Sequence, residues 1–174
     1  MGLSYYYTFS APKSVPAAEL ESFVKKVERE ANKMGFAPAI VINGSFATNE
    51  QKQFARRITS GLLVTNPALK GVTLLDTSRV WNYDPERGEC RAIPEKGVLL
   101  VVTDEHGCEI VFGFLWYPDA LLDVNGRELV MVPHKGRWFF RDFVDTPDIR
   151  YRAIVKMFAD AGYLESEKDE YAPQ

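Results

Sequence analysis

Cysteine is scarce in this 174-residue sequence, and neither sign of charge is in clear excess. Each of these two features excludes a class of protein. The two cysteines, Cys90 and Cys108, are too few for a disulfide framework in a chain long enough to build its own core. The 21 basic and 24 acidic residues leave a formal net charge of −3, which creates no field that attracts nucleic acid or an anionic membrane. We therefore expect reduced thiols and neither a nucleic-acid nor a membrane partner.

Long hydrophobic runs and short motifs for cofactors are also missing. No segment reaches the ~18 apolar residues that a bilayer span needs. Residues 1–10 lack the basic and apolar regions of a secretory leader. The chain contains no Cys-x-x-Cys, no His-Glu-x-x-His, no Walker-type loop and no Gly-x-Gly-x-x-Gly. These absences predict a cytoplasmic protein without a metal or other cofactor.

The first half of the chain alternates strand and helix patterns. Apolar residues recur at helical spacing from Leu20 to Met34, and Gly35 is placed to end that helix. Thr48 and Gln51 have the spacing of a capping box, which predicts the start of a second helix. The expected elements are a strand at 5–9, a helix ending at 34, a strand at 39–42, a helix at 49–60 and two short strands at 62–64 and 72–75.

Between residues 79 and 144, apolar runs alternate with turn signals at the intervals typical of an antiparallel meander. The dipeptide Asn125-Gly126 predicts a tight primed turn within it. A helix start at 145–147 and Gly162 then delimit a last helix. The expected strands of the meander are 80–83, 90–93, 98–102, 108–116, 121–124, 127–132 and 137–144.

These patterns together predict an α+β fold class. Its sheet is curved and mainly antiparallel, with two helices in the N-terminal half and one C-terminal helix. We expect a single domain over residues 1–164 and a disordered acidic tail over residues 165–174.

The hairpin of residues 98–116 is apolar on both faces. Side chains alternate along a strand, so Phe112 and Phe114 point to one face while Val111 and Leu115 point to the other. Both faces of the sheet centre therefore need a cover. Three alternatives remain for covering the second face: a strongly curved sheet that closes on itself, a second subunit in a homodimer, or a ligand cavity.

Residues able to carry catalysis are present without a specific arrangement. His106, Cys108 and His134 could be imagined as zinc ligands, and either histidine as the base of a cysteine nucleophile, but their spacing matches no motif. His106 is more simply a solvated turn residue, and Cys108 a small apolar strand residue. Asp145 and Asp148 are explained by helix capping.

The most suggestive polar pattern lies in the last strand of the meander. Arg137, Phe139 and Arg141 alternate onto one face, and arginines among aromatics can hold a carboxylate or phosphate or contribute to a protein interface. The plainer interpretation is a half-exposed strand whose arginines pair with acidic neighbours. We predict a ligand-binding site on this aromatic sheet face, formed by Arg137, Arg141, Trp116, Phe114 and Phe139.

We therefore expect a noncatalytic domain that binds a small apolar or anionic ligand or a protein partner through this face. The alternative is a small enzyme with its site in the same cavity between sheet and helices, of a reaction class that the sequence does not identify. A pocket with convergent polar groups of shifted pKa would favour the enzyme, and a flat apolar face would favour an interface.

Overall fold

The computed structural model describes residues 2–74 and 79–172 of the chain. These residues form three α-helices and eleven strands in mostly antiparallel sheets, which confirms the predicted α+β class with a curved antiparallel sheet. No helix in this described part of the chain is long and apolar enough to cross a membrane.

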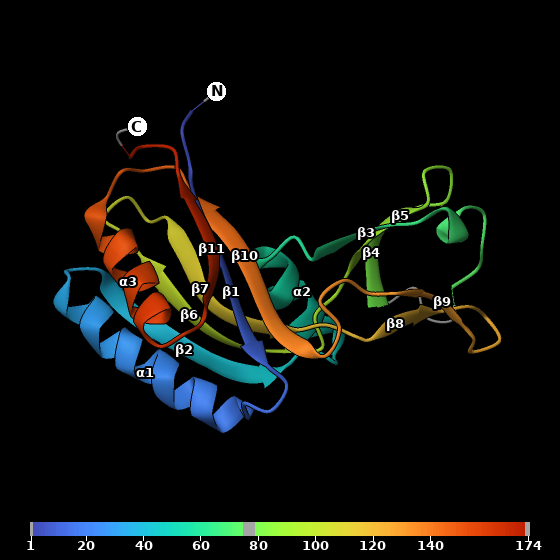
Figure 1. Cartoon of the computed structure of the whole chain (residues 1–174), viewed down its shortest axis with the longest axis horizontal. Coiled ribbons are helices and arrows are strands. Elements are labelled where there is room, and N and C mark those ends of the chain that lie inside the picture. The colour runs from blue at the N-terminus through green and yellow to red at the C-terminus, as the bar shows by residue number, and fades with distance from the viewer. Residues whose placement is uncertain (1, 75–78, 173–174) are drawn as a thin grey trace. The chain divides into compact units, whose positions relative to one another are not determined.

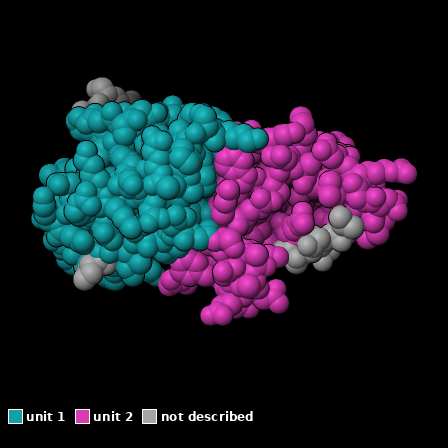
Figure 2. All heavy atoms as spheres, turned by 90° about the horizontal axis from the view of Figure 1, so that it is seen from below, with its two compact units in different colours: residues 1–44, 97–115, 137–174 teal, residues 45–96, 116–136 magenta. Residues whose placement is uncertain are grey.

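The chain forms two compact units, each made from more than one segment (Figure 2). Unit 1 comprises residues 1–44, 97–115 and 137–174, and unit 2 comprises residues 45–96 and 116–136. The chain changes unit after residues 44, 96, 115 and 136. The region predicted as one domain therefore contains two units, and no composition typical of a linker marks their boundaries.

Unit 1 is built on a six-stranded sheet. The strand order is β11-β1-β10-β7-β6-β2, so the first strand lies between the last two strands of the chain (Figure 1). The strands are β1 (Tyr5–Pro12), β2 (Ala37–Ser45), β6 (Lys96–Thr103), β7 (Glu109–Trp116), β10 (Arg137–Val144) and β11 (Leu164–Asp169). Two helices, α1 (Ala17–Lys33) and α3 (Ile149–Asp160), cover one face of this sheet (Figure 1).

Aromatic rings fill the core between this face and the two helices. The ring of Phe9 on β1 stacks on that of Phe158 on α3, with centroids 4.0 Å apart. Phe23 of α1 meets Phe158 edge-on at 4.9 Å. These contacts join the sheet to both helices through geometries that aromatic pairs prefer. The apolar stripe predicted for α1 is buried against this core at Leu20, Val24, Val27 and Ala31.

Residues 164–169 form β11, and this strand corrects the prediction of a disordered tail after residue 164. β11 pairs antiparallel with β1, and Thr8 lies opposite Ser166. Arg152 of α3 holds the strand in place, because its guanidinium donates two hydrogen bonds of 3.0 Å to the carboxylate of Asp169. The prediction failed because an edge strand tolerates charged side chains, which resemble a solvated tail in sequence.

Unit 2 contains one α-helix and two small sheets. The helix α2 (Asn49–Ile58) begins with the predicted capping box, since the Thr48 side chain accepts from the backbone N–H of Gln51 and the Gln51 side chain accepts from that of Thr48. A short 3-10 helix follows at Pro67–Leu69. The strands are β3 (Leu62–Thr65), β4 (Val80–Asp84), β5 (Glu89–Ala92), β8 (Ala120–Leu122) and β9 (Glu128–Met131).

The predicted meander is divided between sheets. β5 pairs with β3 and β4, and β8 pairs with β9, whereas β6, β7 and β10 belong to the six-stranded sheet. Of the strand predicted at 72–75, Leu74 makes an isolated bridge with Asp123, and residue 75 lies outside the described residues. Strand patterns thus indicated where strands occur and the hairpin pairs β6–β7 and β8–β9, but not which strands distant in sequence pair.

The turn at Asn125-Gly126 is longer than the predicted two-residue primed turn. The N–H of Asp123 donates to the carbonyl of Arg127, which leaves a three-residue loop between them. Gly126 has a φ of +78°, and the pairing of β8 with β9 carries a bulge next to Leu122. A three-residue loop closed by a left-handed glycine and a bulge is a common hairpin solution. The Asp123 carboxylate favours it by accepting from the N–H groups of Asn125 and Arg127.

Candidate functional site

The candidate site lies on the face of the six-stranded sheet opposite α1 and α3, which we call the open face. β1 and β10 pair antiparallel, with Tyr6 opposite Phe143 and Thr8 opposite Arg141. Their neighbours in sequence, such as Phe9 and Phe140, point to the core. The alternation of strand side chains therefore places one aromatic pair and one arginine–threonine pair side by side on the open face.

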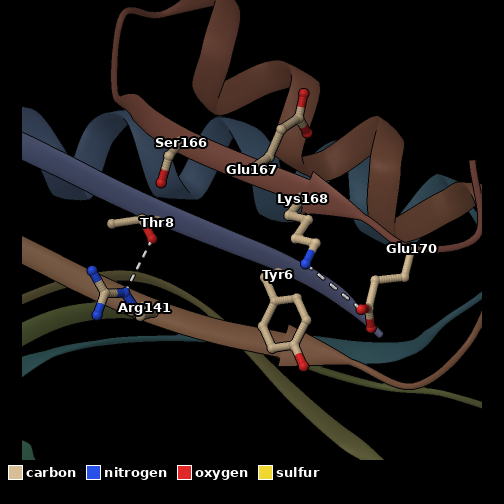
Figure 3. A pocket seen from close by; sticks show the side chains of 7 residues that line it. All are labelled: Tyr6, Thr8, Arg141, Ser166, Glu167, Lys168 and Glu170. Carbon is tan, nitrogen blue, oxygen red and sulfur yellow. Dashed lines mark hydrogen bonds and ion pairs between the residues drawn. The ribbon is translucent and has the colours of Figure 1, made fainter. Parts of the chain in front are cut away.

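A depression of about 460 Å³ occurs on the open face, over β11, β1 and β10 (Figure 3). This volume is within the range of small-molecule sites. We call it the sheet-face depression. It is lined by Tyr6, Thr8, Arg141, Ser166, Glu167, Lys168 and Glu170.

Arg141 is the central cation of the sheet-face depression. Its Nε–H donates a long hydrogen bond of 3.4 Å to Oγ1 of Thr8, and its guanidinium carbon lies 5.3 Å from the ring centroid of Phe139 (Figure 3). Phe139 is buried, so this ring is a fixed platform for the guanidinium. Among the described residues, no carboxylate lies within ion-pair distance of Arg141.

Arg137 also lies near the ring of Phe139, but an ion pair neutralises its charge. Its guanidinium carbon lies 5.6 Å from the centroid of Phe139, and it forms an ion pair with Glu165. The carboxylate reaches Arg137 because β11 has a bulge, where Thr8 pairs with Ser166 and Phe9 with Leu164. Glu165 is the extra residue. The bulge therefore leaves Arg141 as the arginine of this strand that is available to a ligand.

The other charged residues of the depression are Lys168, Glu167 and Glu170. Nζ of Lys168 lies 3.8 Å from a carboxylate oxygen of Glu170 (Figure 3). Glu167 points away from the depression and accepts a 2.5 Å hydrogen bond from the Tyr5 hydroxyl (Figure 3). Burial and this hydrogen bond raise the pKa of Tyr5, so the phenol stays a donor. Among the described residues that line the depression, Arg141 is therefore the cation with no carboxylate within ion-pair distance.

An exposed aromatic pair borders this charge. The rings of Tyr6 and Phe143 have centroids 5.6 Å apart and are tilted by 42°. Tyr6 is 40% exposed and Phe143 is 48% exposed, which is high for large apolar side chains paired across a sheet. By contrast, Val111 and Leu115 of β7 are buried. Part of the accessible apolar surface of the open face therefore lies beside Arg141.

The structure brings together three of the five predicted site residues. Arg137, Phe139 and Arg141 lie in one row on β10. Phe114 instead lies in the core on the opposite face, with its ring centroid 5.6 Å from that of Phe158. Trp116 belongs to unit 2, where Nζ of Lys96 lies 5.3 Å from the centroid of its ring. The sequence showed which side chains of one strand share a face of the sheet. It did not show which side chains of the other strands lie on that same face.

β1 and β11 also contribute side chains to the depression, and no sequence pattern had singled these residues out. Tyr6, Thr8, Ser166 and Lys168 alternate with inward-facing residues, and that period was a usable signal. It pointed to a site only once β1 was known to lie between β10 and β11.

The candidate catalytic residues lie apart from the depression. Cys108 precedes β7 and is exposed, which corrects its interpretation as an apolar strand residue; its N–H donates to the Asp104 carboxylate in a turn. His106 is exposed in the same turn. Cys90 is buried in unit 2, and burial raises the pKa of its thiol to about 11. No cluster of three potential metal ligands occurs among residues 2–74 and 79–172.

The polar groups of the sheet-face depression suit the retention of an anion. One guanidinium, one ammonium and three hydroxyl groups line it beside the carboxylates of Glu167 and Glu170, and neither histidine nor cysteine is among the described residues that line it. Comparison with known proteins found no matching family model, no similar curated protein and no similar solved structure.

Proposed function

We propose that the protein is a noncatalytic binding protein that holds a small anionic ligand in the sheet-face depression, with Arg141 as the anchor. The observation that carries this proposal is a guanidinium seated on the buried ring of Phe139 without a carboxylate partner among the described residues. An arginine in this position presents several N–H donors in a fixed plane, which matches a carboxylate or phosphate.

The comparison with the other arginines of β10 and α3 supports this assignment. Arg137, Arg150 and Arg152 each form an ion pair, with Glu165, with Asp148 and Glu105, and with Asp169. These three arginines stabilise the fold, because their ion pairs connect strands, loops and α3. Arg141 donates one long hydrogen bond to Thr8 and keeps the rest of its donors for an incoming group.

Binding is favoured over catalysis because the depression lacks a paired acid and base. Its hydroxyl groups, on Tyr6, Thr8 and Ser166, have no histidine beside them among the described lining residues. The Glu167 carboxylate is turned to the other face of β11 and holds Tyr5. A general base must reach the proton that it removes, and the other carboxylate among the described lining residues, that of Glu170, forms an ion pair with Lys168.

The test is a titration of isotope-labelled protein with sodium acetate, followed by NMR at the Arg141 Nε–H and at the backbone amides of Thr8 and Ser166. We expect these signals to shift and saturate with acetate. In Arg141→Gln, binding should weaken about tenfold or more, because a charge-assisted hydrogen bond is worth ~1.5–3 kcal/mol.

Arg87→Gln is the matched control. Arg87 has a largely exposed side chain in unit 2 and its replacement makes the same change in charge. This variant should bind acetate as the unchanged protein does. Sodium chloride at equal ionic strength separates specific binding from screening. Shifts that chloride reproduces, or that persist in Arg141→Gln, would refute the proposal.

A further inference from the structure

We infer that the ligand of the sheet-face depression is an aromatic monocarboxylate, whose carboxylate pairs with Arg141 and whose ring lies on Tyr6. This inference rests on the proposed function and narrows it to one chemical class. Three observations support it: the charges that line the depression, the exposed aromatic pair beside them, and the register of β1 and β10, which sets the separation of Tyr6 from Arg141.

The charge balance favours one negative charge. Lys168 is paired with Glu170, and the Glu167 carboxylate faces away, so Arg141 is the one cation among the described lining residues that a ligand can pair with. A phosphate monoester carries nearly two negative charges at neutral pH and would also lie near the Glu170 carboxylate. A carboxylate matches both the charge and the planar donors of the guanidinium.

The exposed aromatic pair favours a ring on the ligand. Tyr6 lines the depression and leans on Phe143, with 5.6 Å between the ring centroids. The pair therefore has a fixed orientation while 40% of Tyr6 stays accessible. A flat ligand ring would cover this surface by offset or edge-on stacking.

The strand register sets the distance between the two parts of the ligand. Tyr6 pairs with Phe143 and Thr8 with Arg141, so Tyr6 and Arg141 are diagonal neighbours on one face. Diagonal neighbours of an antiparallel pair lie about 7–8 Å apart. A carboxylate joined to a ring through a short linker spans such a separation once the side chains extend toward each other.

The experiment measures dissociation constants for acetate, phenylacetate, benzyl alcohol and inorganic phosphate by the same NMR titration at pH 7.5. We expect phenylacetate to bind about tenfold or more tightly than acetate, because stacking adds to the charge contact. Inorganic phosphate should bind no more tightly than acetate, and benzyl alcohol more weakly than phenylacetate. Tyr6→Ala should reduce the advantage of phenylacetate over acetate to less than threefold, and Tyr6→Phe should keep it.

The outcomes separate this inference from the proposed function. Equal constants for acetate and phenylacetate, both lost in Arg141→Gln, would overturn the aromatic class and leave the anion site standing. Tighter binding of phosphate would overturn the monocarboxylate. No binding of any anion would overturn both. Tyr6→Leu is a second variant that keeps side-chain bulk without a ring, in case Tyr6→Ala does not fold, and it should also lose the advantage.

Discussion

Replacing Asp142 with asparagine should stabilise the protein at neutral pH. Asp142 lies on β10 opposite Tyr7, on the face covered by the helices. Its carboxylate accepts one hydrogen bond of 2.8 Å, from the N–H of Phe143. Burial raises the pKa of this carboxyl to about 6, and the single hydrogen bond lowers it only in part. The fold therefore contains a carboxylate whose charge is poorly solvated.

The sign and size of the effect follow from the raised pKa. The ordinary value is 3.8, so the folded state holds the proton more tightly than the unfolded state by about two units. The carboxyl of Asp142 therefore contributes to the free energy of unfolding below pH 3.8, and this contribution is lost as the pH rises through about 6. Two units correspond to ~3 kcal/mol. Since the asparagine amide is also polar and residue 142 is half-buried, so that solvent screens part of the effect, we expect Asp142→Asn to gain ~1–2 kcal/mol at pH 7.

Urea unfolding of both proteins at pH 4, 5, 6 and 7 measures this gain. The difference in unfolding free energy should be smallest at pH 4 and reach its full value above pH 6, where both states of the unchanged protein are ionised. Asp160→Asn is the control, because Asp160 is an exposed residue of α3 paired with Lys156. It should change stability little at any pH. A difference for Asp142→Asn that does not vary with pH, or a loss of stability at pH 7, would refute the argument.

Two further predictions concern packing and thiol chemistry. Gly113→Ala should cost ~1–3 kcal/mol in urea unfolding, because the new Cβ would lie 2.3 Å from the carbonyl oxygen of Val98 on β6. Gly44→Ala, where the Cβ would have no neighbour within 4 Å, is its control, and equal midpoints for the two variants would contradict this close approach. In the native protein one thiol, that of the exposed Cys108, should react rapidly with a disulfide reagent, whereas Cys90 should react only on unfolding because it is buried and its pKa is raised. Two thiols reacting at one rate would contradict this prediction.

The sequence by itself determined the features that depend on neighbours along the chain. The stripe from Leu20 to Ala31 predicted the buried face of α1, because helical spacing alone brings these residues together. The capping box of Thr48 and Gln51 was readable for the same reason, since its two hydrogen bonds span three residues. Alternation placed Arg137, Phe139 and Arg141 in one row of a strand.

Tertiary structure alone decided which strands distant in sequence became neighbours, and with that the candidate site. The charged segment 164–169 is a strand because β1 pairs with it and Arg152 holds Asp169, contacts that no local pattern encodes. The bulge of this strand brings Glu165 to Arg137 and leaves Arg141 available. Backbone hydrogen bonds between strands carry little sequence information, so partner choice depends on how the whole core packs. The row of arginines was therefore predictable, but not the depression into which one of them faces.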